Sequence, residues 1–167
     1  MIKTFNSLLV TMFGLGKVRF IPGTLGSLAT ATFLFYLFHA LNVSSNIILI
    51  GWTIIFVYSF YAVSTHIKNS KNKDPQEIII DEFLGQSIPI YLYEISHVTT
   101  KESNEAIAYY ALFFILFRYF DIMKPFPVNY FDKNFKNSFG VIMDDICAGL
   151  YVVATLVVFM IIKKHVL

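Results

Sequence analysis

The sequence predicts an all-α, polytopic helical membrane protein with about four to five membrane helices and its polar motifs gathered at one face. Hydrophobic residues make up 56% of the 167 residues and charged residues only 14%, whereas a soluble domain usually carries about 25% charged residues. The apolar residues form continuous runs and not one-sided stripes, which is typical of helices surrounded by lipid. We expect one membrane-embedded helical domain over residues 1–167.

Five apolar runs are candidates for membrane helices. The three longest have 17 residues each and cover Leu25–Leu41, Ile47–Val63 and Ile146–Ile162. Seventeen helical residues span roughly 26 Å, which is near the lower limit for crossing a bilayer. The run Ala106–Phe117 is shorter but extends when Tyr119 and Phe120 are included. The run Phe83–Tyr93 is too short alone, so it either re-enters the membrane or ends a longer helix that begins near Pro75.

The polar residues between these runs lie in three segments, residues 14–27, 66–82 and 118–145. If the region Phe83–Tyr93 crosses the membrane, all three segments lie on one side, together with ten of the 13 Lys and Arg residues. Positive residues favour the cytoplasmic side, so we expect the three segments to face the cytoplasm. The net charge of +2 is too small to indicate binding to nucleic acid, and no obligatory protein partner is evident.

The first acidic motif is KDPQEIIIDEFLG. Asp74, Pro75 and Glu77 have the pattern of a helix start, with an N-cap, a proline at the first position and an acid three residues after the cap. In such a helix Glu77 and Asp81 share a face, and their like charges repel unless a cation compensates. Glu77, Asp81 and the adjacent Glu82 are therefore candidate metal ligands. The alternative is that Glu77 only caps the helix while the other two acids face solvent.

The second acidic motif, GVIMDDICAGLY, places Asp144 and Asp145 directly before the last apolar run. Acids at a helix start gain from the helix dipole, which is one explanation for the pair. However, ionisable groups that enter a membrane helix are costly and are usually functional. Carboxylates without a paired His or Cys favour Mg²⁺ over Zn²⁺, so the pair predicts Mg²⁺ ligands.

Two further motifs suit an anion. In FRYFDIMKPFP, Arg118, Asp121 and Lys124 share one face of a helix if the helix continues to Pro125. Arg binds a phosphate through two hydrogen bonds and Lys binds it as a point charge, although both cations could instead reach lipid headgroups.

In PGTLGSL, Thr24 or Ser27 can cap the apolar helix that follows, and Gly26 permits the close approach of a ligand to the backbone. Free backbone N–H groups at such a helix start favour an anion, although the motif is weak by itself and lacks the lysine of a P-loop. Carboxylates for Mg²⁺ and cations for phosphate at one membrane face indicate metal-assisted phosphoryl transfer or hydrolysis. A phospholipid with a terminal phosphate fits as the substrate.

With these motifs, the sequence resembles the phosphatidylglycerophosphatase A family. The matching blocks are GLGKVRFIPGTLGSL, DPQEIIIDEFLG, FRYFDIMKPFPV and GVIMDDICAG, which together run across residues 14–149. The resemblance implies Mg²⁺-dependent removal of the terminal phosphate of phosphatidylglycerol phosphate in the bacterial inner membrane, by a multi-pass enzyme with a cytoplasmic active site. Two departures from the family pattern are Ile21, where alanine is common, and Ser138–Phe139, which replaces a glycine pair.

These observations give a set of expected roles. Catalysis is assigned to Asp81, Arg118, Asp121 and Lys124. Phosphate binding is assigned to Thr24, Gly26, Ser27, Arg118 and Lys124. The Mg²⁺ ligands are expected among Glu77, Asp81, Glu82, Asp144 and Asp145. The nucleophile is either a water activated by Mg²⁺, which we prefer, or an aspartate, Asp121 or Asp81, that forms an aspartyl-phosphate.

Two other functions are considered. A small Mg²⁺ transporter or channel would use the acidic motifs as an ion pathway, but its acids should lie at mid-depth and not beside Arg118 and Lys124. A CDP-alcohol phosphotransferase would carry an array of aspartates with an Ala-Arg pair, and the sequence has no such array.

Overall fold

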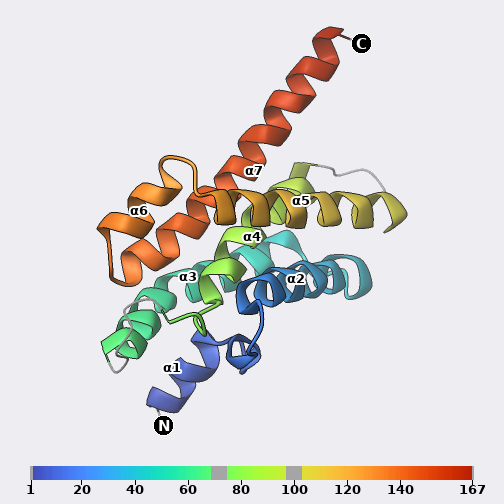
Figure 1. The fold of residues 1–167 in the computed structure, drawn as a ribbon. Helices are drawn as coiled ribbons and strands as arrows, with labels where there is room; N and C mark the ends of the chain where they lie inside the picture. Colours follow the sequence, from blue (N-terminus) through green and yellow to red (C-terminus); the bar gives the residue numbers. More distant parts are fainter. Residues whose placement is uncertain (1, 69–74, 97–102, 167) are drawn as a thin grey trace.

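The computed structural model describes residues 2–68, 75–96 and 103–166, and in these ranges the chain is helical without strands (Figure 1). The α-helices are α1 (Ile2–Val10), α2 (Pro22–Phe35), α3 (Ser45–Lys68), α4 (Ile80–Ser96), α5 (Ser103–Met123), α6 (Val128–Asn134) and α7 (Ser138–Val166). Two short helices complete the set, the 3₁₀ turn η1 (Leu15–Lys17) and the π-helical turn η2 (Tyr36–Ala40). The predicted all-α fold is confirmed.

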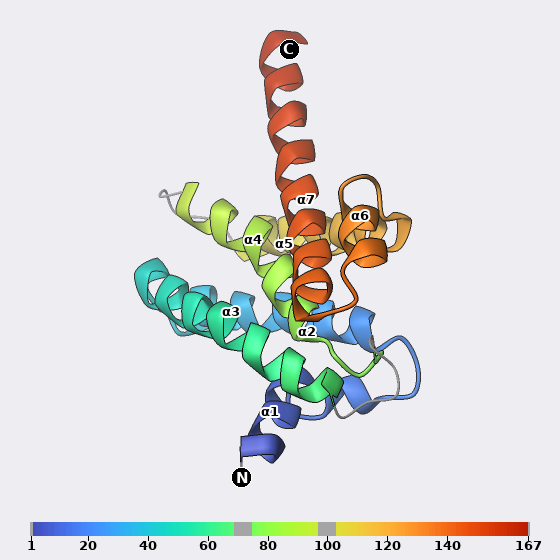
Figure 2. The same ribbon diagram turned by 90° about the vertical axis from the view of Figure 1, so that its left-hand side faces the viewer.

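Helix α4 lies at the centre and contacts α2, α3, α5 and α7. Its buried residues belong to two apolar clusters, one shared with α1, α3 and α7 and the other with α2, α5 and α7. The C-terminal half of α7 extends away from the other helices in both ribbon views (Figures 1 and 2). The site described below is built around the first turns of α4, where the polar segments meet.

Three described helices are long and apolar enough to cross a membrane. They cover Ser45–Lys68, Glu105–Met123 and Ser138–Ile162. The predicted run Leu25–Leu41 is divided between α2 and the π turn η2. The run Phe83–Tyr93 lies inside α4, which has 17 residues and buries most of them against its neighbours. The count of four to five membrane helices is therefore approximate.

The predicted start of the central helix is wrong. α4 begins at Ile80 and not near Pro75, and Asp74, the expected N-cap, lies outside the described residues. The backbone N–H of Ile79 donates to the carbonyl of Val10 at 2.9 Å, a long-range bond that replaces a helical one. Residues 78–80 are all buried isoleucines, and consecutive helical residues point in different directions, so a surface helix would expose at least one of them.

Two other helix boundaries also differ from expectation. α5 ends at Met123, and Lys124 has φ 45°, so Lys124 does not continue the helical stripe of Arg118 and Asp121. α7 begins at Ser138, which places the aspartate pair inside the helix and not directly at its start. The Asn137 side chain accepts hydrogen bonds from the backbone N–H groups of residues 139 and 140, each at 3.1 Å, and thus caps α7.

Close backbone contact between α4 and α7 sets the geometry of the site. A Cβ atom at Gly85 would collide with the carbonyl oxygen of Asp145, and one at Gly149 would collide with the carbonyl oxygen of Gly85. Small residues let membrane helices approach in this way. The contact brings the acids of α4 beside the acids of α7.

Candidate active site

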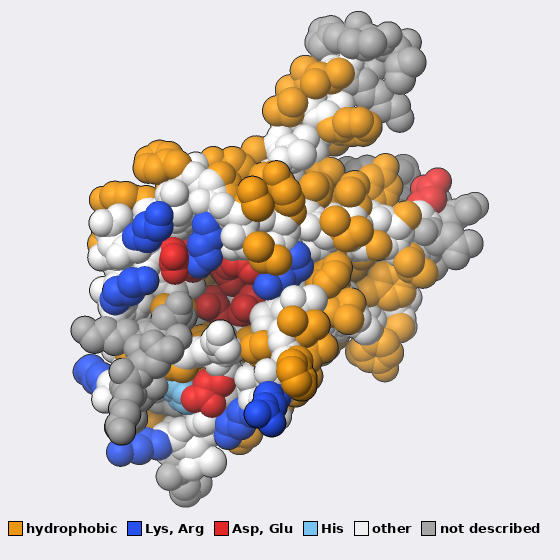
Figure 3. Space-filling view, in the orientation of Figure 1, with side chains coloured by type: hydrophobic (Ala, Val, Ile, Leu, Met, Phe, Trp, Pro, Cys, Tyr) orange, Lys and Arg blue, Asp and Glu red, His pale blue; other side chains and the backbone are white. Residues whose placement is uncertain are grey.

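The three polar segments meet in one pocket of about 330 Å³. Its charged and hydroxyl-bearing lining residues are Thr24, Asp81, Glu82, Arg118, Asp121, Lys124, Asp132, Lys136, Asp144 and Asp145. Figure 3 shows acidic side chains in a hollow near the centre of one face, with Lys and Arg side chains beside them. The prediction that the polar motifs gather at one face is confirmed.

Three acids form the centre of the pocket. Asp81, Glu82 and Asp145 each offer a carboxylate oxygen, and these oxygens lie within 4.8 Å of one another. Asp81 is 9% exposed and Asp145 3% exposed. Asp81 Oδ1 and Glu82 Oε2 are buried and have no hydrogen-bond partner in the part of the chain that the structure describes. Buried carboxylate oxygens without partners are costly, and a bound cation would offset this cost.

Lys124 is held between two carboxylates. Its Nζ lies 3.0 Å from Asp132 Oδ1 and 3.0 Å from Asp144 Oδ2. Burial alone would lower the pKa of Lys124, but the carboxylates of Asp144 and Asp132 outweigh it and raise this pKa above its ordinary value. Lys124 therefore carries a fixed positive charge at the pocket.

Arg118 supplies a second positive charge from α5. Its Nη1 forms an ion pair with Asp121 Oδ2 at 2.5 Å and lies 4.0 Å from Glu82 Oε1. The Arg118 Nε is buried and has no hydrogen-bond partner among the described residues. The guanidinium is thus oriented by one acid while one of its donors is unpaired in the described part of the chain.

Comparison with known proteins shows the family of the chain. The profile of the family Phosphatidylglycerophosphatase A matches residues 8–160. The chain belongs to the phosphatidylglycerophosphatase A family. It is therefore a lipid phosphatase, a phosphoric monoester hydrolase, and the ion-transport alternative has no support.

Three relatives cover most of the chain. The phosphatidylglycerophosphatase A of Haemophilus influenzae is 36% identical over 152 residues, which are 91% of this chain and 85% of the relative. That of Escherichia coli K12 is 31% identical over 144 residues, 86% of this chain and 76% of the relative. A protein of Bacteroides thetaiotaomicron with the provisional name phosphatidylinositol-3-phosphatase is 30% identical over 149 residues, 86% of each chain. No solved structure matches the chain significantly.

Two of the five expected metal ligands, Glu77 and Asp144, are not part of the group of three converging acids. Glu77 does not line the pocket, and its Oε1 lies 2.8 Å from Nε2 of His66. Asp144 lines the pocket, but its Oδ2 binds Lys124 and its Oδ1 accepts from the backbone N–H of Asp145 at 3.0 Å. The phosphatidylglycerophosphatase A motifs thus bring Asp81, Glu82 and Asp145 together, and Glu77 lies outside that group.

The start of α2 contributes to the pocket differently from expectation. Thr24 lines the pocket, whereas the Cα of Gly26 faces Ile79 and the hydroxyl of buried Ser27 donates to the carbonyl of Gly23 at 2.9 Å. Neither expected cap is used, because Ile21 occupies the N-cap position without a side-chain cap bond.

Three pocket residues were missed by sequence reasoning. A Cβ at Gly23 would collide with Glu82 Oε1 and approach Arg118 Nη1, so a larger residue here would require the Glu82 carboxylate to move. Asp132 and Lys136 reach the pocket from α6 and the loop after it, and Lys136 Nζ donates to the backbone carbonyl of Asp132 at 2.6 Å. Gly23, which follows Pro22, could have been identified from the sequence as a position where another group approaches the backbone closely. The spacing of Asp132 and Lys136 gave no such signal.

Proposed function

We propose that this protein removes the terminal phosphate of phosphatidylglycerol phosphate to give phosphatidylglycerol, with Mg²⁺, as a multi-pass enzyme of the bacterial inner membrane. The names of the relatives from Haemophilus influenzae and Escherichia coli support this substrate. The observation that carries the proposal is the pairing of a buried carboxylate group with two fixed cations in one pocket.

The carboxylate group fits Mg²⁺. Asp81, Glu82 and Asp145 would hold the ion, since their carboxylates converge, and Asp81 Oδ1 and Glu82 Oε2 have no hydrogen-bond partner among the described residues. No His or Cys is part of this group, which favours a hard, oxygen-binding cation. When bound, Mg²⁺ would neutralise phosphoryl oxygens and activate water for attack.

The cations fit the phosphate. Arg118 would donate to phosphoryl oxygens, and Lys124 would add a point charge. Asp121 holds the guanidinium in place, because its carboxylate pairs with Arg118 Nη1. Charge that develops on the phosphoryl oxygens in the transition state then meets fixed positive groups.

A water nucleophile and an aspartyl-phosphate remain the two candidate routes. Asp121 is engaged with Arg118, and Asp81 is one of the proposed Mg²⁺ ligands, so both aspartates have other roles and direct attack by water is preferred. Acid quenching of the enzyme with ³²P-labelled substrate distinguishes the routes. Label retained on the protein would reject direct water attack.

We place the pocket at the cytoplasmic face. Lys17, Arg19, Lys133 and Lys136 belong to the segments that supply the pocket, and positive residues favour this side. Labelling of single cysteines, in a Cys147→Ser background, tests the proposal. A cysteine at exposed Asn137 should react from the cytoplasmic side and one at exposed Asn42, between α2 and α3, from the other side. Reaction of Asn137→Cys from the periplasmic side would contradict it.

The decisive experiment measures phosphate release by the purified protein from a panel of phospholipid phosphomonoesters. The panel contains phosphatidylglycerol phosphate, phosphatidic acid and phosphatidylinositol 3-phosphate, each with Mg²⁺ and with EDTA. We expect the highest kcat/KM for phosphatidylglycerol phosphate and loss of activity in EDTA that Mg²⁺ restores. Preference for another lipid would refute the proposed substrate. Full activity in EDTA would refute the proposed requirement for Mg²⁺.

A further inference from the structure

The mouth of the polar pocket has an apolar side. Ile21, at the N-cap of α2, and Ile122, in the last turn of α5, both line the pocket. Their exposed fractions are 66% and 68%. Two large apolar side chains therefore stand at the edge of a pocket whose other walls are charged.

The backbone at Ile21 is unusual for its residue type. Ile21 has φ 47° and ψ 49°, the left-handed conformation, which is uncommon for a β-branched residue. The side chain makes no cap bond and is not buried in the core. Neither helix capping nor core packing explains an isoleucine here, whereas contact with lipid would.

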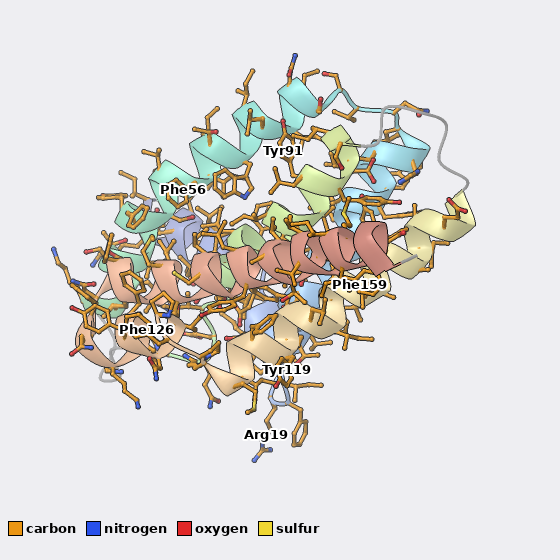
Figure 4. The ribbon with its side chains drawn as sticks, turned by 90° about the horizontal axis from the view of Figure 1, so that it is seen from above. Arg19, Phe56, Tyr91, Tyr119, Phe126 and Phe159 are labelled. Atoms are coloured by element: carbon orange, nitrogen blue, oxygen red, sulfur yellow. The ribbon has the colours of Figure 1, made fainter. Side chains whose placement is uncertain are left out.

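The surface next to the mouth continues this apolar character. Phe20, Met123 and Phe126 are adjacent in sequence to the mouth and are highly exposed. Figure 3 shows a broad area of hydrophobic side chains that begins close to one side of the acidic hollow, with Lys and Arg side chains around the hollow itself. In Figure 4, Arg19 and Tyr119 both project from the same edge of the molecule. The pocket is thus open toward an apolar surface.

We infer that the substrate enters the pocket sideways from the bilayer, between the start of α2 and the end of α5. Its phosphate lies with Arg118 and Lys124, while its glycerol and acyl region passes over Ile21 and Ile122 into the lipid. This inference rests on the proposed function, because it concerns the path of the same lipid. The phosphate of such a lipid needs charged groups around it, and its two acyl chains remain in the bilayer. The mouth of the pocket must therefore be charged on one side and apolar on the other.

A paired set of variants tests the path. The double variant Ile21→Asn/Ile122→Asn removes the apolar side of the mouth, and asparagine tolerates the left-handed conformation at position 21. The matched control is Phe20→Asn/Met123→Asn, since both residues are comparably exposed, at 73% and 63%, but do not line the pocket. Both are compared with the unchanged enzyme on long-chain phosphatidylglycerol phosphate in vesicles and on its dihexanoyl analogue in monomeric solution.

We expect the mouth variant to raise KM for the vesicle substrate about tenfold, the size of a lost apolar contact, with kcat retained. The rate on the dihexanoyl analogue should stay within about twofold of the unchanged enzyme, and the control variant should stay close to it on both substrates. Equal losses in the mouth variant and the control would show general membrane anchoring and overturn the inference. Equal losses on both substrates, or no loss, would also overturn it, whereas an unchanged enzyme that hydrolyses neither substrate refutes the proposed function itself.

Discussion

Two hollows lie along α4 and differ in chemistry. The polar pocket, of about 330 Å³, contains the carboxylates and cations described above. The second hollow, of about 500 Å³, lies between α2, α3 and α4 and is lined almost entirely by apolar side chains, among them Leu34, Trp52 and Tyr91. In Figure 4, Tyr91 and Tyr119 lie on opposite sides of α7.

The difference between the two hollows suggests that the polar pocket serves catalysis and the apolar hollow affects only stability. An apolar hollow in a membrane protein leaves no polar group without a partner, so lipid chains can fill it at little cost. In the polar pocket, buried oxygens of Asp81 and Glu82 lack partners within the described ranges, which costs on the order of several kcal/mol unless a ligand offsets it. Substitutions in the polar pocket should therefore change catalysis, and those in the apolar hollow should change only stability.

The largest effect is expected from the central acids. Asp145→Asn, and separately Asp81→Asn, should lower phosphate release by at least about 10³-fold, because the charge that attracts Mg²⁺ is reduced. The helix content by circular dichroism should not change, since asparagine has nearly the same shape. Near-normal rates of both variants in limiting Mg²⁺ would refute the metal site.

Glu77→Gln is the matched control for these acids. It also neutralises a carboxylate of the same motif, but Glu77 pairs with His66 outside the pocket. We expect its rate to stay within about threefold of the unchanged enzyme. A loss of rate as large as that of Asp81→Asn would indicate that Glu77 is a metal ligand after all.

The next effect is expected at Arg118. Arg118→Lys keeps the charge but loses the planar fork, so kcat should fall about 10²–10³-fold. Single-turnover measurements separate this chemical defect from slow product release. An Arg118→Lys enzyme of unchanged kcat would reject recognition of the phosphate through two hydrogen bonds.

A smaller effect is expected at Asp132, which the sequence did not single out. Asp132→Asn weakens one of the two ion pairs that hold Lys124, and kcat should fall about tenfold, as for other groups that orient a ligand. Asp132→Glu, which restores the charge, should recover part of the rate. If Asp132→Asn is fully active, Asp144 alone positions Lys124.

The smallest effect is expected in the apolar hollow. Gly51 lines it, lies inside α3, and a Cβ there would meet no atom within 4 Å. Gly51→Ala should raise the free energy of unfolding by about 0.5–1 kcal/mol, because glycine is less favourable than alanine within a helix. Phosphate release should not change. A clear loss of activity would mean that the apolar hollow takes part in catalysis and would remove the contrast drawn here.

The sequence predicted those features that depend on local patterns. Continuous apolar runs located the helices, and the positions of the polar segments predicted that Asp81, Arg118 and Asp145 share one face. The position of Glu77 was not predictable, because a long-range bond from Ile79 to Val10 displaces the start of α4. The contact of Asp132 with Lys124 depends on how separate helices approach, and no spacing along the chain records that approach.

The glycine contact between α4 and α7 also determines when during synthesis the acids of the two helices come together. Asp145 reaches the other acids only after α7 has emerged from the ribosome and packed on Gly85. A nascent chain with α2 to α5 already inserted holds Asp81 and Arg118 but lacks a third of the proposed metal site. With Asp145 as a ligand of the proposed metal site, we expect partly synthesised chains not to hydrolyse the lipids of the membrane into which they are being inserted.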